Sequence, residues 1–530
     1  MRRLNAHTRP KEQTLGPTSP PAPAKMGVQR RRPSSRRRIA GALALLAAAT
    51  LALLLLCPSA PPSYGVIIDG GSTGSRVHVI AYRSGAGRDT LPRIDWARTA
   101  SLKATPGLSS FAVDPSGAGR SLAPLVEFAK RHVPRGSWGD TEVRLMATAG
   151  LRLLDAAVAE SVLESCRDML RQSGFRFQDE WATVISGAEE GIYAWVAANY
   201  ALGTLGGDSR ETTGIIELGG ASVQVTFATS ESLPPEFSHV IKSGDVTYNL
   251  YSHSFLHLGQ NVAYESLHDL LSSPDLKSMA THLVPQANYK DPCTPRGFTH
   301  IAGAVNLPAS VLEPKVEYRR FAHAVGNFSE CRSAVQTVLQ KGKETCKYRE
   351  CRLGAAFVPE LEGKFIATEN FYHTSKFFGL HSKSFLSDLM LAGEKFCPGD
   401  WSKIKEKYSS FNEGELLLFC FSSAYIIALL HDSLKLPMDH KRIDVANQIR
   451  GVPVDWALGA FIMQKSINLT EYSDSTLHPD VAKTTAEDDL RHGERPVHHN
   501  EAKPLSLARR HLELTQLLRR VTSDRACRFS

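Results

Sequence analysis

Two widespread motifs are missing from this sequence, and each absence argues against a class of site. The chain has no Gly-x-x-x-x-Gly-Lys-Ser/Thr segment, so it is not a P-loop protein. It also has no Cys-x-x-Cys pair. Cys346 and Cys351 are the most closely spaced of its nine cysteines, and no cysteine or histidine pair follows them at ligand spacing. The pattern therefore gives little support to a zinc site.

Acidic residues are nearly absent from the N-terminal 38 residues, which contain eleven Lys and Arg and a single acid, Glu12. The whole chain has a formal net charge of +8, so the rest of it is close to −2 and the basic character belongs to this tail. Such a balance gives no support to nucleic-acid binding. Because Pro and Ser are frequent in the tail and large apolar residues are scarce, we expect residues 1–38 to be disordered.

A run without charge follows the tail at residues 39–57. Its 19 residues are long enough to cross a hydrocarbon core, and the basic cluster at 30–38 predicts a cytosolic tail. We therefore predict a type II signal anchor, with the body of the protein lumenal or extracellular; a cleaved signal peptide is the alternative. After Leu469 the sequence is polar and has no apolar run of spanning length, so we expect no second membrane helix.

The segment GVIIDGGSTGSRVHVIAY at 65–82 predicts two strands joined by a tight turn. An apolar run leads to Asp69, and alternation of apolar and polar residues resumes at Val77. Three glycines in the turn allow positive φ angles and leave room for a ligand. We expect the backbone N–H groups and hydroxyls of the turn to form a concavity suited to phosphate oxygens, with Asp69 at its mouth free to hold a cation.

A second segment of the same kind, GIIELGGASVQVTF at 214–227, again has an apolar strand, an acid, a Gly-Gly turn and a returning strand. Its acid, Glu217, lies 148 positions after Asp69. This separation is too long for a solenoid repeat and suits duplicated domains. Two such hairpins that face each other across a cleft can bind a polyphosphate from both sides.

A capping-box pattern marks the start of a helix in ISGAEEGIYAW at 185–195, where Ser186 is followed three residues later by Glu189. Capping gives Glu189 a structural role and leaves the neighbouring Glu190 without one. A carboxylate there can accept a proton from a water that attacks a terminal phosphorus. A solvated glutamate at a helix start is the alternative. No serine, cysteine or aspartate is placed as an evident nucleophile, which favours direct attack by water.

The segment MATAGLRLL at 146–154 predicts the end of a strand, a turn of small residues and the start of a helix. Such a turn can aim N–H groups and the Thr148 hydroxyl into a cleft, and a helix N-terminus adds partial positive charge. An ordinary strand-to-helix turn is the alternative reading.

Together these segments resemble the nucleoside triphosphate diphosphohydrolase (apyrase) family, in its plant-type apyrase-like form. Five short blocks of that family occur in order: IDGGSTGSR at 68–76, MATAGLRLL at 146–154, ISGAEEGIYAW at 185–195, ELGGASVQVTF at 217–227 and DWALGAF at 455–461. The resemblance implies an α/β fold of two RNase H-like (actin/Hsp70-type) lobes with a nucleotide cleft between them, preceded by one N-terminal transmembrane helix. We expect lobe I at 65–187, lobe II at 188–450, a return segment to lobe I at 451–470 and a polar tail at 471–530.

The resemblance also implies roles for the residues of these blocks. Glu190 matches the position of the catalytic base, while Asp69 and Glu217 are predicted to hold a divalent cation, largely through its waters. We expect this cation to be Ca²⁺, with Mg²⁺ able to substitute. The predicted nucleotide- and phosphate-binding residues are Gly71, Ser72, Thr73, Gly74, Ser75, Arg76, Thr148, Arg152, Gly219, Gly220, Ala221, Ser222 and Gln224.

Cysteine usage fits an oxidising compartment. Spacing alone leaves the connectivity open, but the family resemblance favours three pairs: Cys293 with Cys331, Cys346 with Cys351, and Cys397 with Cys420. Cys166 and Cys527 then have no evident partner. Glycosylation sequons at Asn327 and Asn468 also fit the secretory pathway.

We predict an apyrase that removes terminal phosphates from nucleoside tri- and diphosphates by metal-assisted attack of water. The alternatives on the same fold are a Golgi nucleoside diphosphatase that prefers UDP or GDP, a sugar-kinase-like phosphotransferase and a nucleotide-binding receptor. The receptor is supported only by Glu217, where the family usually has Asp; Gly70, where it usually has Ala, is the other departure. The predicted location is a Golgi or plasma membrane, with nucleotides as partners and neither a nucleic acid nor a protein partner inferred.

Overall fold

The computed structural model describes residues 61–85, 91–272, 289–298, 322–466 and 469–472. The predicted disordered tail at 1–38, the predicted signal anchor at 39–57, Asn468 and the polar tail from residue 473 lie outside these ranges. Cys57 and Cys527 lie outside them as well. The described residues up to Glu471 belong to one compact unit.

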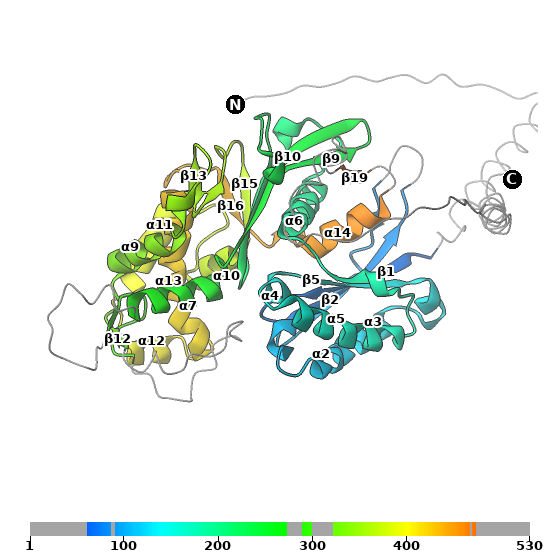
Figure 1. Ribbon diagram of the computed structural model, residues 1–530, viewed down its shortest axis with the longest axis horizontal. Coiled ribbons are helices and arrows are strands. Elements are labelled where there is room, and N and C mark those ends of the chain that lie inside the picture. Colours follow the sequence, from blue (N-terminus) through cyan, green and yellow to red (C-terminus); the bar gives the residue numbers. More distant parts are fainter. Residues whose placement is uncertain (1–60, 86–90, 273–288, 299–321, 467–468, 473–530) are drawn as a thin grey trace, which may run out of the picture. The chain divides into compact units, whose positions relative to one another are not determined.

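The first of two mixed sheets contains the first predicted hairpin (Figure 1). Its strands are β1 (Ser63–Gly70), β2 (Ser75–Arg83), β3 (Arg93–Ile94), β4 (Ala100–Ala104), β5 (Glu142–Ala147) and β6 (Ala182–Val184). The order is β3-β2-β1-β5-β6, and β4 also pairs with β2. The hairpin β1–β2 is antiparallel, whereas β5 runs parallel to β1 and β6 runs parallel to β5.

The second sheet repeats this arrangement around the second predicted hairpin. Its strands, in spatial order, are β16 (Ile443–Val445), β15 (Phe365–Glu369), β7 (Gly214–Leu218), β8 (Ser222–Ala228), β10 (Val246–Leu256), β9 (Ser238–Ser243) and β19 (Leu469–Tyr472). The hairpin β7–β8 is antiparallel, and β15 and β16 continue the sheet in parallel on the side of β7. The predicted α/β class is confirmed, while the lobe boundaries remain predictions.

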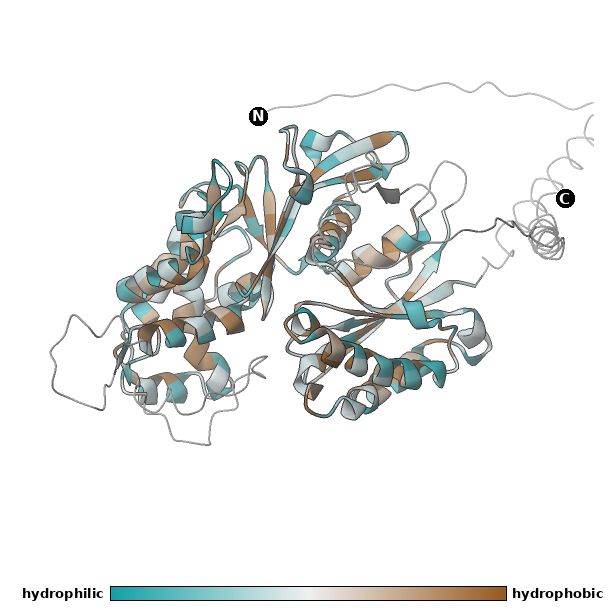
Figure 2. Ribbon diagram, viewed as in Figure 1, coloured by the Kyte–Doolittle hydropathy of each residue, from teal (hydrophilic) through white to brown (hydrophobic). Residues whose placement is uncertain are grey.

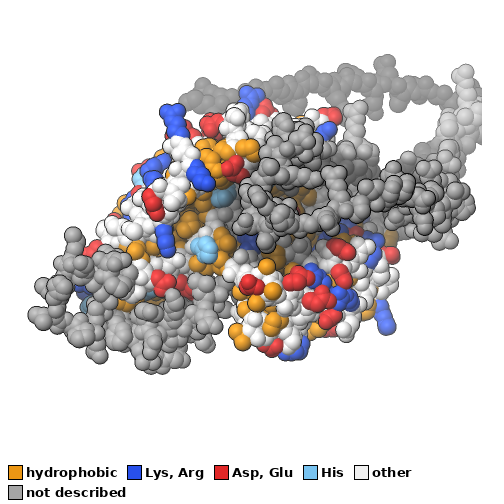
Figure 3. Space-filling view, viewed as in Figure 1, with side chains coloured by type: hydrophobic (Ala, Val, Ile, Leu, Met, Phe, Trp, Pro, Cys, Tyr) orange, Lys and Arg blue, Asp and Glu red, His pale blue; other side chains and the backbone are white. Residues whose placement is uncertain are grey.

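Helices cover one face of the first sheet (Figure 1). They are α2 (Ser116–Ser121), α3 (Ala123–His132) and α5 (Ala156–Arg171), with the short α4 (Ala149–Arg152) between β5 and α5. On α5 the inward residues include Val162, Leu163 and the free cysteine Cys166, all buried. Its outer side carries an ion-pair network in which Arg171 contacts Glu164, and Figure 3 shows charges of both signs on this face.

Two central helices, α6 (Gly187–Leu202) and α14 (Trp456–Lys465), lie side by side and pack against both sheets (Figures 1 and 2). Their hydrophobic cluster combines Ile67 of β1, Trp195 of α6 and Ile215 of β7. The two helix backbones approach closely, because a Cβ atom at position 459 would lie 1.7 Å from the carbonyl oxygen of Tyr193. A glycine is therefore required at this contact.

The remaining helices pack around the second sheet. They are α7 (Gln260–Ser272), α9 (Phe328–Leu339), α10 (Asn370–Phe377), α11 (Leu386–Phe396), α12 (Trp401–Lys407) and α13 (Glu413–Ile427), which continues into a π-helical segment at Ala428–Ser433. The continuous helix Glu413–Ser433 is the one helix of the described residues that is long and apolar enough to cross a membrane. Because 89% of its most apolar 18-residue stretch is buried in the protein, it is a core helix.

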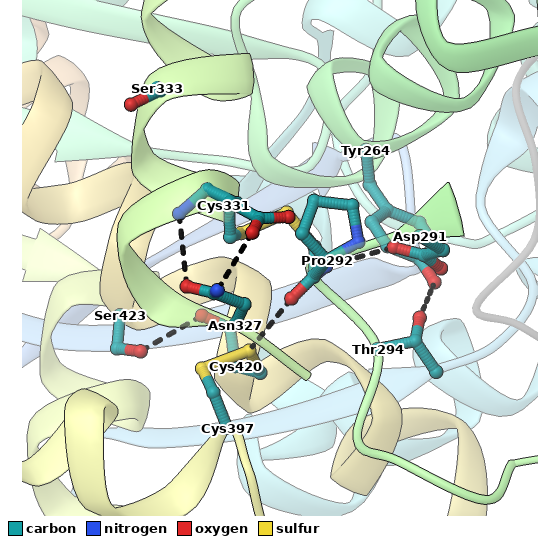
Figure 4. The surroundings of a disulfide bond; sticks show 12 residues. Tyr264, Asp291, Pro292, Thr294, Asn327, Cys331, Ser333, Cys397, Cys420 and Ser423 are labelled. Atoms are coloured by element: carbon teal, nitrogen blue, oxygen red, sulfur yellow. Dashed lines mark hydrogen bonds between the residues drawn. A yellow bond between two sulfur atoms is a disulfide. The ribbon is translucent and has the colours of Figure 1, made fainter. Parts of the chain in front are cut away.

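Three disulfides join the outer segments, and they are the three predicted pairs: Cys293–Cys331, Cys346–Cys351 and Cys397–Cys420. Figure 4 shows two of these bonds close together, with the Pro292 carbonyl oxygen 3.9 Å from Sγ of Cys420. Small two-stranded sheets lie in the same outer region and near α14: β11 (Tyr289–Asp291) with β12 (Ala322–Ala324), β13 (Cys351–Leu353) with β14 (Ala356–Phe357), and β17 (Gln448–Ile449) with β18 (Val452–Pro453).

Candidate active site

A cavity of about 1160 Å³ is lined by the turns of both hairpins. Of the residues predicted for the site, only Ser75 and Arg152 do not line it. Those that do are Asp69, Gly71, Ser72, Thr73, Gly74, Arg76, Thr148, Glu190, Glu217, Gly219, Gly220, Ala221, Ser222 and Gln224. Segments far apart in the sequence thus line one cavity, with the two hairpin turns in close contact. A Cβ atom at Gly220 would lie 2.8 Å from Oγ of Ser72.

The first hairpin pairs Asp69 with Arg76 directly across β1 and β2. The predicted positive φ angles in its turn are wrong, because none of its glycines is among the described residues with positive φ. Close backbone approach explains two of them instead. A Cβ at Gly71 would lie 2.9 Å from the carbonyl oxygen of Gly74, and one at Gly74 would lie 2.7 Å from that of Ala104.

The second hairpin pairs Glu217 with Gln224 across β7 and β8. Its turn is held by the first residues of α7. The backbone N–H groups of Gln260 and Asn261 donate to the carbonyl oxygens of Gly219 and Gly220, each at 2.9 Å. These bonds use carbonyl groups of the turn, so the turn keeps its shape without a ligand.

The start of α6 has the predicted capping box. The Glu189 N–H donates to Oγ of Ser186 at 3.1 Å, and the Ser186 N–H donates to Oε2 of Glu189 at 2.7 Å. The next residue, Glu190, is buried at the cavity wall. Its Oε2 accepts hydrogen bonds from Nη2 of Arg152 at 2.7 Å and from Nε2 of Gln224 at 3.1 Å. The two neighbouring glutamates therefore have separate environments.

Three carboxyl groups of the cavity have raised pKa values, and burial is the main cause for each. Burial raises the pKa of Asp69, which Arg76 partly offsets, and burial raises the pKa of Glu190, which Arg152 partly offsets. Burial and the negative charges of Glu190 and Glu369 raise the pKa of Glu217. Shifts of this kind are concentrated at functional sites.

Two of these acids have an oxygen suited to a cation. Oδ1 of Asp69 and Oε2 of Glu217 are buried and accept no hydrogen bond within the described part of the chain. A carboxylate oxygen cannot donate when it is ionised, so a cation or water is the partner that satisfies it. Among the described residues, no group of three or more His, Cys, Asp or Glu side chains can hold a metal ion together. The donor set therefore fits a cation that keeps several waters.

Sequence reasoning missed Lys103 and Glu369, which both line the cavity. Lys103 of β4 lies directly opposite Arg76 of β2, so the chain places a row of Asp69, Arg76 and Lys103 across three strands. Neither cation forms an ion pair with a described residue. Nothing in the sequence near Lys103 marks it as a site residue; only the β2–β4 register brings it to the cavity.

Glu369 lies at the junction of β15 and α10 with φ 59° and ψ −118°. A residue other than glycine rarely adopts this conformation, and such outliers gather at functional sites. The Glu369 N–H donates to Oδ1 of Asn447 at 2.7 Å.

An aromatic group lines another part of the cavity. Phe377 and Phe419 stack with ring centroids 3.6 Å apart, and Phe411 remains 40% exposed. His373 of α10 also lines the cavity, whereas Tyr372 does not. Exposed aromatic surface of this kind can stack on a flat ring.

The comparisons with known proteins agree with this geometry. The model of the GDA1/CD39 (nucleoside phosphatase) family matches residues 58–476. A relative from Arabidopsis thaliana, "Probable apyrase 6", is 53% identical over 412 residues, which cover 78% of this chain and 74% of that protein. A second, "Nucleoside-diphosphatase mig-23" from Caenorhabditis elegans, is 31% identical over 76% of each chain.

Among solved structures, a crystal structure of nucleoside triphosphate hydrolases from Neospora caninum covers 79% of this chain and 96% of its own, with a TM-score of 0.55. At 18% sequence identity this likeness concerns the fold alone.

Proposed function

This chain belongs to the GDA1/CD39 (nucleoside phosphatase) family, and from that premise we propose how its cavity hydrolyses nucleoside tri- and diphosphates. The proposal is that water attacks the terminal phosphorus directly and that Glu190 is the general base. One observation supports this role most directly. Of the two glutamates in the first turn of α6, Glu190 has no capping role, and it is buried in the wall of the cavity that both hairpins line.

The proton transfer follows from the surroundings of Glu190. A water on the cavity side forms a bond to phosphorus and gives its proton to the Glu190 carboxylate, while the bond from phosphorus to the bridging oxygen breaks. The products are inorganic phosphate and a nucleotide shortened by one phosphate. General-base catalysis of this kind contributes roughly 10²- to 10⁴-fold to a rate.

Charge on the phosphates is neutralised by groups of the first sheet. Arg76 and Lys103 are cations without a carboxylate partner among the described residues, and both line the cavity beside the Ser72 and Thr73 hydroxyls. Donors that are already in place when charge develops stabilise a phosphoryl-transfer transition state without reorganisation. The leaving oxygen and the transferred group are thereby stabilised on the side of the first hairpin.

Asp69 and Glu217 are proposed to hold a divalent cation, Ca²⁺ with Mg²⁺ able to substitute. The support is that each has a buried oxygen without a hydrogen-bond donor. When bound, such a cation neutralises phosphate charge and polarises the phosphorus–oxygen bond. Glu217 reaches one methylene further than the aspartate usual in the family, and its carboxylate still holds the cation.

The finer organisation of the protein is part of the same proposal. We propose a type II anchor at residues 39–57, a lumenal or extracellular catalytic part, and two RNase H-like lobes on either side of the cavity. The support comes from the charge-free run in the sequence, from three disulfides and from the matching strand arrangement of the two sheets.

The test is phosphate release by the full-length chain from ATP, ADP, UDP and GDP, with Ca²⁺, with Mg²⁺ and with a chelator. Glu190→Gln should lower kcat by about 10²-fold or more and leave nucleotide binding intact. Glu189→Gln is the matched control, since glutamine also serves in a capping box and the residue does not line the cavity. Equal activity of both variants would contradict the role of Glu190, and the relative rates on the four nucleotides would identify the preferred substrates.

A further inference from the structure

Arg152 belongs to the block MATAGLRLL, where the sequence suggests a phosphate-binding residue, but it does not line the cavity. Thr148 and Ala149 of the same turn do line it. The Arg152 side chain turns instead toward the start of α6 and forms an ion pair with Glu190. The side chain of Arg152 is only 14% exposed, and that of Glu190 is 10% exposed.

We propose that Arg152 is a positioning residue that fixes which oxygen of Glu190 faces the attacking water. This inference rests on the proposed role of Glu190 as general base. It assigns to Arg152 no contact with the substrate.

The guanidinium is held at two points. Nη1 donates to the carbonyl oxygen of Ile185 at 3.0 Å, and Nη2 donates to Oε2 of Glu190 at 2.7 Å. Ile185 directly precedes the N-cap of α6, and Glu190 lies in the first turn of that helix. Arg152 therefore clamps the carboxyl group to the backbone at the beginning of its own helix. The planar guanidinium makes both bonds through two separate nitrogens in a fixed geometry.

The second donor to Glu190 acts on the same oxygen. Nε2 of Gln224, on β8, lies 3.1 Å from Oε2 of Glu190, and the Oγ atoms of Ser222 and Ser254 lie within reach of the same two N–H donors. No hydrogen bond from the described residues reaches Oε1 of Glu190. With Oε2 occupied by two donors, Oε1 is the oxygen left to accept a proton from water.

Charge supports the same arrangement. The charged groups that act most on Glu190 are Arg152 and Glu369, with opposite signs. Burial raises the pKa of Glu190, and Arg152 opposes this rise, so the cation keeps a buried carboxyl group ionised and ready to accept a proton. Without Arg152 the carboxyl group would be both freer to rotate and harder to ionise.

The variants Arg152→Lys and Arg152→Ala in the full-length chain test this assignment. Lysine keeps the charge but lacks the rigid fork of two nitrogens. We expect kcat to fall about 100-fold, as for a small misplacement of a reacting group, while KM changes less than about threefold. The acid limb of the pH profile of kcat/KM should move to higher pH in Arg152→Ala. Added guanidinium chloride at low concentration should restore part of the activity of that variant and none to Glu190→Gln.

A matched control is Arg332→Gln, which breaks a partly buried pair with Asp432 whose two N–O distances are 2.7 and 2.6 Å. This pair lies outside the cavity lining, so its loss should lower the melting temperature without moving kcat or the pH profile. Melting curves of the Arg152 variants show whether they are folded. If guanidinium restores activity to a variant that is folded, the loss of activity in that variant was not caused by unfolding.

Two results would overturn the inference. A KM increase of tenfold or more with an unchanged pH profile would make Arg152 a phosphate-binding residue, and wild-type kcat in folded Arg152→Ala would give it no role in catalysis. Both results differ from the result that would contradict the proposed function. In that case Glu190→Gln itself would retain wild-type activity.

Discussion

Asp69 and Arg76 stand directly opposite each other in the first hairpin, whereas the equivalent acid of the second hairpin, Glu217, stands opposite the neutral Gln224. Both acids have a pKa raised by burial, and only for Asp69 does a cation, Arg76, oppose that rise. The negative charges of Glu190 and Glu369 act on both acids, so Arg76 is what distinguishes them. Of the two acids, Glu217 therefore gains more from a bound divalent cation.

This difference predicts a pH-dependent stabilisation by Ca²⁺. A carboxyl group whose pKa is raised in the folded state contributes stability at pH values below its unfolded pKa, about 4.3 for Glu, and loses it as pH rises through the folded pKa. With a chelator present, the melting temperature should therefore fall between pH 5.5 and pH 7.5, because the buried carboxyl groups of Asp69 and Glu217 ionise. Ca²⁺ should raise it more at pH 7.5, where protons compete less.

Glu217→Gln should remove most of the chelator-dependent fall and most of the Ca²⁺ effect, because the uncharged amide needs no counter-ion. Glu362→Gln, at an exposed acid outside the cavity, is the control and should behave as the wild type. A Ca²⁺ effect of equal size at both pH values and in Glu217→Gln would place the cation elsewhere.

Lys103→Ala tests the unpaired cations of the first sheet. A hydrogen bond to a charged group contributes about 1.5–3 kcal/mol, so we expect the KM for ATP to rise about tenfold or more. The salt dependence of KM should also become weaker, because one cation that attracts the polyphosphate is gone. Lys242→Ala, at an exposed lysine of β9 outside the cavity, should change neither quantity. An unchanged KM in Lys103→Ala would exclude this residue from phosphate binding.

The parts of the site that the sequence predicted are those encoded locally. The Asp69 and Glu217 hairpins and the Ser186–Glu189 capping box each lie within about twenty residues of continuous sequence, so turn chemistry and periodicity are sufficient to identify them. The family resemblance then supplied what spacing could not, including the three disulfide pairs.

The parts that sequence reasoning missed depend on tertiary neighbours. Lys103 reaches the cavity through the β2–β4 register, and Glu369 through the crossing from β15 into α10. Arg152 lies in a recognised block, yet its partner is 38 positions away in the sequence, and only the fold reveals that it pairs with Glu190. A local sequence pattern identifies a candidate residue, whereas tertiary packing determines which residue a charged side chain pairs with.

The three disulfides should contribute unequally to stability. They close loops with sequence separations of 38, 23 and 5 residues. On loop-closure entropy alone, the first is worth about 4 kcal/mol and the third about 2 kcal/mol. The double variant Cys346→Ser/Cys351→Ser should therefore lower the denaturation midpoint less than Cys293→Ser/Cys331→Ser does. The opposite order would mean that the short loop is needed for the native packing and not only for chain entropy.

Glu369 combines a left-handed backbone conformation with a charge that acts on the whole cavity, and two substitutions separate these properties. Its carboxylate raises the pKa values of Asp69, Glu190 and Glu217. Removing that charge in Glu369→Gln should lower the pKa of Glu190, so the acid limb of kcat/KM should move to lower pH while the melting temperature stays near that of the wild type. Glu369→Gly should move the limb in the same way and also relieve a strain of about 1–3 kcal/mol, offset in part by the chain entropy of glycine, about 0.5–1 kcal/mol. Glu369→Gly should therefore melt at a higher temperature than Glu369→Gln. If Glu369→Gly melts at a lower temperature than Glu369→Gln, the backbone conformation of Glu369 is not strained.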